Sequence, residues 1–190
     1  IFMPTHSSLL LIVRKDNDTI PLLADFSGES PLLYLPDSIP ENPETPPAFC
    51  MLLRKHLEDG RISSFEQTGL DRIITLEIDL IGSARQIVTK KLVFELTGKN
   101  SNIIFLENVV VIDSLKHVNK SMSSFRQVLP NQPYFPPPTQ NGFSFIYSSP
   151  LDIVGKVMAQ NAKKALQSLI TETTGIGKFT ATELLQRSNI

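Results

Sequence analysis

The sequence predicts an α+β fold in which a mostly antiparallel β-sheet, or a sandwich of such sheets, is followed by a helical region. Side chains alternate with a period of two at residues 74–80 and again at 92–96, an apolar helical stripe precedes them at 47–59, and helical spacing returns after Pro150. A period of two is typical of a half-buried strand, whereas spacings of three and four are typical of an amphipathic helix. We therefore expect a β-rich domain over residues 1–148 and a helical region over 149–190.

The composition is that of an ordinary globular chain. Of 190 residues, 41% are hydrophobic and 19% charged, with a formal net charge of −1, whereas intrinsic disorder requires low hydrophobicity and high net charge. No apolar run approaches the roughly 20 residues that span a bilayer, so we expect no membrane segment. Cys50 is the single cysteine, and no Cys/His group has the spacing of a zinc site. We predict no metal and no other cofactor.

The first 60 residues predict three strands and one helix. Short apolar runs at 8–14, 20–24 and 32–35 indicate the strands, and a proline-rich connector follows them. The helix is expected at 47–59 with Gly60 beyond its end, because glycine suits that position. Its apolar face comprises Phe49, Leu52, Leu53, His56 and Leu57.

Beyond Gly60 the spacing indicates a meander of strands. We expect strands at 74–80, 92–96, 102–107 and 109–113. Short links between neighbouring strands favour antiparallel pairing, because parallel pairs need long crossovers. Residues 60–113 are thus predicted to form a sheet with one buried face, and we expect the stiff proline-rich segment 129–138 to wrap it.

The last forty residues have helical periodicity. Apolar stripes at 151–158 and 162–170 predict two helices, and a Gly175-Ile-Gly177 turn leads into a third at 179–187. The turn resembles that of a helix-hairpin-helix element, in which glycine amides and a helix N-terminus face a nucleic-acid phosphate. Any Gly-x-Gly before a helix has the same local pattern, so a purely structural turn is the alternative.

The sequence lacks the arrangements that nucleophilic catalysis requires. It has no Gly-x-Ser-x-Gly elbow, and His6, His56 and His117 lie in different predicted elements. We interpret His56 as a structural residue on an apolar helical face. Cys50 lies in a first helical turn, where the dipole lowers a thiol pKa, but its place beside Phe49 favours core packing. We predict that the protein is not an enzyme.

Two polar sites have alternative interpretations. The turn with Lys99 and Asn100 is either a plain hairpin connection or a donor of hydrogen bonds to a backbone phosphate. Asp71 and Arg72, at the start of a predicted strand, form either a surface ion pair or a contact to base edges. The first 48 residues are acidic and the remainder is net basic, a distribution that permits a nucleic-acid partner without requiring one.

Several blocks occur in an order that identifies a family. Residues 46–62 read Pro-Pro-Ala-Phe-Cys-Met-Leu-Leu-Arg-Lys-His-Leu-Glu-Asp-Gly-Arg-Ile, and 69–72 read Gly-Leu-Asp-Arg. Later blocks are Gly98-Lys-Asn-Ser-Asn-Ile-Ile104, Asp113-Ser-Leu-Lys-His-Val118, Arg126-Gln-Val-Leu-Pro-Asn-Gln-Pro-Tyr134 and residues 175–185. Together they resemble the NFACT family, often labelled fibronectin- or fibrinogen-binding proteins in Gram-positive bacteria.

The resemblance implies a fold similar to the N-terminal domain of formamidopyrimidine-DNA-glycosylase-type proteins, followed by helix-hairpin-helix elements. Family members are ribosome quality-control factors that bind the large ribosomal subunit carrying peptidyl-tRNA. They recruit tRNA to extend the stalled nascent chain, with alanine in bacteria. This implies a cytoplasmic, ribosome-associated, RNA-binding protein whose partners are tRNA and the large subunit.

The family's Asp-Arg pair reads the tRNA anticodon region and maps onto Asp71 and Arg72. Adding residues that suit phosphate contact, we predict the following nucleic-acid-binding residues: Asp71, Arg72, Arg61, Lys99, Asn100, Gly175 and Gly177. The resemblance also implies an N-terminal segment with an acidic residue, coiled-coil arms and a C-terminal domain, none of which this chain includes. We therefore expect it to be an N-terminal fragment that does not support tailing alone.

Two other functions are alternatives to this prediction. The family's older label implies a surface adhesin for fibronectin or fibrinogen, which requires export, yet the sequence has no wall-anchor motif and no charged repeat array. A DNA-repair enzyme would need a proline nucleophile, where this chain has Ile1. Fold similarity does not by itself imply enzyme chemistry.

Overall fold

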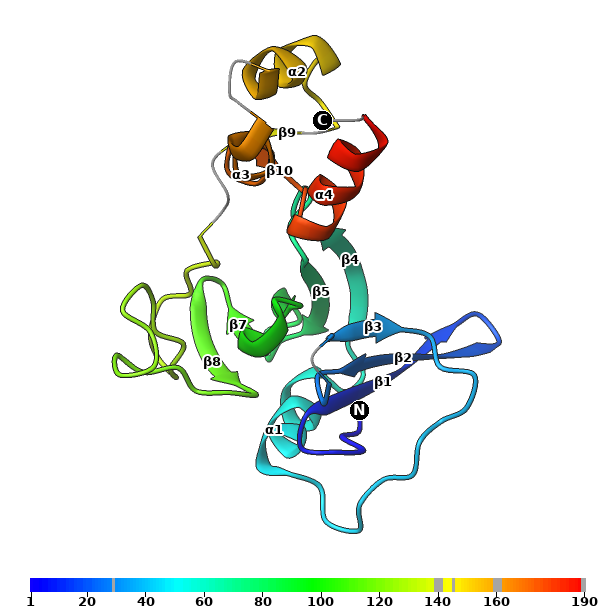
Figure 1. Cartoon of the computed structure of the whole chain (residues 1–190). Coiled ribbons are helices and arrows are strands. Elements are labelled where there is room, and N and C mark those ends of the chain that lie inside the picture. The colour runs from blue at the N-terminus through cyan, green and yellow to red at the C-terminus, as the bar shows by residue number, and fades with distance from the viewer. Residues whose placement is uncertain (29, 139–141, 145, 159–161, 189–190) are drawn as a thin grey trace. The chain divides into compact units, whose positions relative to one another are not determined.

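The structure is a computed structural model that describes residues 1–28, 30–138, 142–144, 146–158 and 162–188 (Figure 1). The chain forms two compact units. Unit 1 comprises Ile1–Thr68 and Arg72–Pro136, and unit 2 comprises Gly69–Asp71 and Pro137–Ile190. The units therefore divide earlier in the chain than the predicted boundary at 148. The two-domain assignment stays a prediction.

A three-stranded antiparallel sheet begins unit 1. Its strands β1 (Ser8–Lys15), β2 (Asp18–Asp25) and β3 (Leu32–Tyr34) lie in that order. Asp16 adopts a φ of 54° in the turn between β1 and β2, a conformation that Asp tolerates better than most residues. These strands confirm the prediction for this part of the chain.

The predicted amphipathic helix is also present, as α1 (Ala48–Leu57). Pro47 precedes its first turn and its carbonyl accepts a hydrogen bond from the Met51 amide at 3.1 Å. The helix buries the face that the sequence indicated, including Phe49, Leu53 and Leu57. Gly60 follows the helix closely, and a Cβ there would lie 2.4 Å from Ile78 Cγ2, so this position cannot accommodate a side chain without local rearrangement.

Five antiparallel strands make the second sheet of unit 1. Its order is β4-β5-β6-β7-β8, with bounds β4 (Arg61–Gln67), β5 (Ile73–Ile81), β6 (Ile87–Glu95), β7 (Asn102–Glu107) and β8 (Val110–Ser114). The α+β class with mostly antiparallel sheets is confirmed. Strand β4 was not predicted, because its sequence lacks a clear apolar–polar alternation. It is an edge strand in which no residue is buried.

This sheet is buried on both faces, whereas one buried face was predicted. One face contributes Leu76, Leu92, Phe94 and Phe105 to a core shared with α1 and the three-stranded sheet. The other face packs Ile73, Val93, Ile104, Leu106 and Val111 against Val128 and Tyr134. The proline-rich segment thus wraps the sheet as predicted: the Val111 amide donates to Gln132 O at 2.9 Å and the Tyr134 amide to Val109 O at 2.7 Å.

Unit 2 is helical, with α2 (Pro150–Met158), α3 (Ala162–Glu172) and α4 (Lys178–Arg187). The helices predicted for this region are present. Parts of the predicted apolar stripes, at 156–158 and 162–165, fall on residues whose side chains are outside the described ones. Two short strands that were not predicted, β9 (Phe143–Ser144) and β10 (Thr173–Thr174), pair in parallel. Ile153, Leu169, Ile176 and Ala181 form its buried core.

Candidate nucleic-acid interface

Three strand ends of the five-stranded sheet meet at one edge. Ile73, the first residue of β5, pairs with Glu95 at the end of β6, and Glu95 in turn pairs with Asn102 at the start of β7. Arg72 directly precedes β5, and its carbonyl accepts a hydrogen bond from the Leu96 amide at 2.8 Å. The backbone at Arg72 is therefore anchored while its side chain is exposed.

The segment between β6 and β7 is a 3-10 turn, Gly98–Asn100. Gly98 has a φ of 73°, and its carbonyl accepts from the Ser101 amide at 2.9 Å and from Ser101 Oγ at 2.6 Å. Ser101 is buried, and Lys99 and Asn100 are exposed. The turn thus exposes the Lys99 ammonium and the Asn100 amide near the start of β5, which follows Arg72.

Asn102 has a structural role at the start of β7. Its Oδ1 accepts from the Lys116 amide at 2.9 Å and its Nδ2 donates to the Lys116 carbonyl at 2.8 Å. Ser114 Oγ donates to the same carbonyl at 3.0 Å. These bonds attach the segment after β8 to the sheet edge.

A buried ionic network lies behind this edge. The Glu95 carboxylate is fully buried and accepts from both terminal nitrogens of Arg126, at 2.8 and 2.5 Å, and from Tyr134 Oη at 2.8 Å. Arg126 Nη1 also donates to the Phe135 carbonyl at 2.8 Å. Burial, followed by the Glu95 charge, raises the pKa of Tyr134 far above its usual value. The neutral phenol thus donates its hydrogen bond to the Glu95 carboxylate.

The structure does not group all the predicted residues. Arg72, Lys99 and Asn100 belong to one edge of the sheet, but Arg61 pairs with Asp79, near the other end of β5. At roughly 3.3 Å per residue, Arg61 lies about 20 Å along the strands from the Arg72 edge. Asp71 belongs to unit 2 and Arg72 to unit 1, so the boundary between the units passes between the two residues.

The remaining two predicted residues lie in the turn between α3 and α4 in unit 2. Gly175 has a φ of 88°, which favours glycine, and a Cβ there would lie 2.5 Å from Leu70 Cδ1, so the leucine side chain would have to move. Gly177 is the N-cap of α4 without a side-chain cap, and its carbonyl accepts from the Ala181 amide at 2.9 Å. Gly177 and Lys178 are exposed, leaving the start of α4 accessible.

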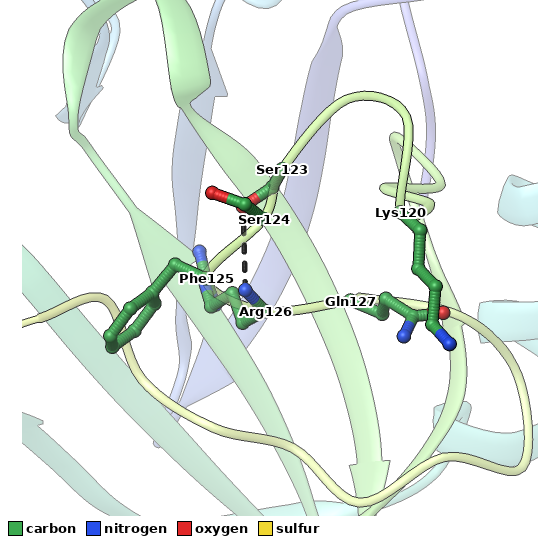
Figure 2. Close-up of a pocket in the computed structure, with 6 residues that line it drawn as sticks. All are labelled: Lys120, Ser123, Ser124, Phe125, Arg126 and Gln127. Carbon is green, nitrogen blue, oxygen red and sulfur yellow. Dashed lines mark hydrogen bonds between the residues drawn. The ribbon is translucent and has the colours of Figure 1, made fainter.

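One feature of unit 1 was missed in the sequence. A pocket of about 280 Å³ lies in the loop between residues 119 and 127 (Figure 2). Its lining residues are Lys120, Ser123, Ser124, Phe125, Arg126 and Gln127. The signal that could have indicated it is the absence of any Asp or Glu between Asp113 and Asp152, which leaves the lysines of this segment without acidic neighbours in sequence.

The described residues contain no group of three or more His, Cys, Asp or Glu side chains placed to hold a metal ion. Besides Tyr134, two further side chains with shifted pKa values lie elsewhere in unit 1. Burial raises the pKa of Cys50 and lowers that of His56, and both residues pack in or beside the α1 core. None of the helices in the described part of the chain has the length and apolar character needed for a bilayer crossing.

Comparisons with known proteins give relatives in bacteria and archaea. The chain is 34% identical over 192 residues to "Rqc2 homolog RqcH" of Bacillus subtilis, which covers 100% of this chain and 34% of the relative. It is 31% identical over 152 residues to "Archaeal Rqc2 homolog aRqcH" of Methanocaldococcus jannaschii, covering 79% of this chain and 22% of the relative. The chain spans about a third of the length of the bacterial relatives.

Solved structures share this fold. The N-terminal part of the fibronectin/fibrinogen-binding protein from Streptococcus suis superposes with a TM-score of 0.84 at 27% identity, over 100% of this chain and 71% of that chain. The N-terminal domain of fibronectin-binding protein PavA from Streptococcus pneumoniae gives 0.83 at 26% identity, over 99% and 70%. The family model for the NFACT N-terminal and middle domains matches residues 1–190. The chain therefore belongs to the NFACT family.

Proposed function

We propose that this chain is part of a ribosome quality-control factor. Such a factor binds the large ribosomal subunit carrying peptidyl-tRNA and recruits tRNA to extend the stalled nascent chain, with alanine in bacteria. The observation that carries the proposal is the match to relatives named Rqc2 homologs, which in Bacillus subtilis extends over the whole chain. Relatives in a bacterium and an archaeon favour a role in translation, which both share. A protein with this role acts in the cytoplasm, on ribosomes.

The exposed edge of the five-stranded sheet is the proposed RNA contact of unit 1. The Arg72 guanidinium can stack on an unpaired base or donate two parallel hydrogen bonds to it, and Lys99 and Asn100 can bind the adjoining phosphates. We propose that the Asp71 carboxylate accepts a hydrogen bond from a base amine, while Arg72 acts as the donor. Arg61 lies at the other end of the strands and would contact a different part of the RNA backbone.

In unit 2 we propose that α3, the Gly175–Gly177 turn and α4 act as a helix-hairpin-helix element. The exposed N-terminus of α4 offers backbone amides that no side chain caps, and such amides bind phosphate oxygens. From the same family resemblance we further propose that unit 1 has a fold similar to the N-terminal domain of formamidopyrimidine-type glycosylases. The proposed role is binding, without enzyme chemistry or a cofactor.

The test uses full-length protein from its native cells. Sucrose-gradient sedimentation is followed by sequencing of co-purifying RNA, for the wild type, for Asp71→Ala with Arg72→Ala, and for Arg85→Ala as a control at an exposed arginine in the β5–β6 hairpin. We expect co-migration with free large subunits and enriched tRNA, lost in the double variant and kept in the control. Unchanged tRNA in the double variant would refute the assigned site.

A second candidate function is that of a surface adhesin for fibronectin or fibrinogen. The observation that favours it is the name of the structural relatives, which are fibronectin/fibrinogen-binding proteins. The test is surface proteolysis of intact cells combined with binding to immobilised fibronectin. Protein that is mostly protease-accessible on intact cells, and absent from ribosomal fractions even when stalling is induced, would make the adhesin the leading function.

A further inference from the structure

The loop between residues 119 and 127 is held in a defined shape. At its base, Val118 and Val128 exchange two backbone hydrogen bonds of 2.9 and 2.8 Å. At its start, Asn119 Oδ1 accepts from the Ser121 amide at 3.0 Å and from Ser121 Oγ at 2.6 Å. At its end, Arg126 is fixed by the buried Glu95 carboxylate. A loop ordered before binding loses less entropy when a ligand arrives.

The pocket in this loop carries a net positive charge. Lys120 lines it, and no described residue forms an ion pair or hydrogen bond with the Lys120 ammonium. The Arg126 charge, by contrast, is balanced by Glu95. Since no acidic residue occurs between Asp113 and Asp152, the Lys120 charge has no local carboxylate in sequence to neutralise it. The ligand that complements it is an anion.

An exposed aromatic ring borders the same pocket. Phe125 is 64% exposed, although a phenylalanine of a well-packed loop is more often buried. Figure 2 shows the Phe125 ring at one side of the pocket, with Lys120 and Gln127 at the other. Ser124 and Gln127 add polar groups between or beside them. A strand with one base stacked on Phe125 would therefore pass the polar groups of the loop and meet the Lys120 cation at the opposite side of the pocket.

We propose that this pocket binds single-stranded RNA, with a base stacked on Phe125 and a backbone phosphate of the same strand at Lys120. The pocket volume of about 280 Å³ is just below the usual range of small-molecule pockets, which favours part of a strand over a large free ligand. Aromatic side chains beside cations are the common means of holding unpaired bases. The inference rests on the proposed function and adds a second RNA contact to it, separate from the Asp71 and Arg72 site.

The first experiment measures binding of a fluorescein-labelled oligouridylate to the full-length protein by fluorescence anisotropy at several salt concentrations. Phe125→Ala should raise the Kd at least about fivefold, because a lost base stack weakens binding by that much or more. Lys120→Ala should reduce the slope of log K against log salt by about 0.7, the value for one phosphate contact on a single strand. Lys120→Arg should restore most of that slope.

Matched controls come from exposed residues of unit 1 outside the pocket. Phe65 on β4 is 51% exposed, so Phe65→Ala tests the loss of an exposed ring, and Lys15→Ala tests the loss of an exposed charge at the end of β1. Both should leave Kd and salt slope unchanged. Photocrosslinking with 4-thiouridine RNA, read by mass spectrometry, should place the crosslink within residues 120–127.

The outcomes separate the inference from the proposed function. Crosslinks elsewhere, with unchanged binding by the Phe125 and Lys120 variants while tRNA still co-purifies, would overturn the pocket and leave the function standing. A wild-type protein that binds neither the oligouridylate nor tRNA would overturn both. If adenosine monophosphate displaces bound RNA no better than inorganic phosphate does, the pocket binds an RNA strand and not a free mononucleotide. Tight binding of the mononucleotide without any RNA crosslink would overturn RNA as the source.

Discussion

Arg126 and Glu95 form two parallel hydrogen bonds across 31 residues of sequence, from Nη1 to Oε1 at 2.8 Å and from Nη2 to Oε2 at 2.5 Å. Glu95 is the last residue of β6 and pairs with Ile73, which directly follows Arg72. Arg126 lies near the end of the loop that forms the pocket. This pair therefore connects the predicted RNA-contacting edge of the sheet to the pocket loop.

Removing Arg126 should strongly destabilise unit 1. Arg126→Ala leaves the Glu95 carboxylate buried without its counterion, which costs about 3–5 kcal/mol in comparable pairs. The free energy of unfolding in urea measures the loss. Arg187→Ala is the matched control, because its pair with Glu183 is exposed on α4 and such pairs contribute under about 1 kcal/mol. Equal losses in the two variants would contradict this role of Glu95.

The stability of unit 1 should depend on His56 in mildly acidic solution. Burial lowers the pKa of His56, and the charges of Lys90 and Lys55 lower it further, against an opposing effect of Glu107. The Lys90 ammonium lies 3.4 Å from His56 Nδ1. Because the unfolded chain protonates this residue near pH 6.5 while the folded chain does so only at lower pH, stability should fall as the pH drops below 6.5.

Urea unfolding at pH 7.5 and at pH 5.5 tests this dependence. His56→Gln should show a smaller decrease between the two pH values than the wild type. His6→Gln, at an exposed histidine, should keep the full decrease. A wild-type stability that stays constant or rises on acidification, with the same result for His56→Gln, would show that His56 makes no such contribution.

Cys50 should be inert in the folded protein. Its side chain is fully buried in the α1 core, and burial raises the pKa of the thiol against the opposing effect of Arg54. Because the thiolate is the reactive form, both factors slow alkylation. Iodoacetamide labelling followed by mass spectrometry should find Cys50 unmodified in native buffer and fully modified in guanidinium. Rapid native labelling would mean that α1 opens readily from the sheet.

Gly175→Ala should destabilise unit 2. The φ of 88° disfavours any residue with a Cβ, and that Cβ would meet Leu70 at 2.5 Å, so we expect a loss of about 1–3 kcal/mol. Gly177→Ser is the control, because a Cβ there meets nothing within 4 Å and serine is a good N-cap. Hydrogen exchange of the α3 and α4 amides, which should become faster only in Gly175→Ala, measures the effect.

The candidate site was partly predictable from sequence. Lys99 and Asn100 stand in a turn whose glycine and serine are turn residues, and Arg72 directly precedes an alternating strand, so their exposure followed from local pattern. The pocket at Lys120 and Phe125 was not predicted, because a loop of serines with one phenylalanine has no periodicity. Its shape depends on the pairing of Val118 with Val128 and of Arg126 with Glu95.

The sequence by itself determined the α+β class, the helix at α1, most strands of both sheets and the family, because periodicity and ordered motifs are properties of short segments. Only the tertiary structure decided that the second face of the sheet is covered, that Glu95 is buried, and that Arg61 lies at the far end from Arg72. Burial and charge pairing depend on segments distant in sequence. The local sequence around a strand glutamate is the same whether its side chain is exposed to water or buried beside an arginine. Only folding brings Glu95 and Arg126 together.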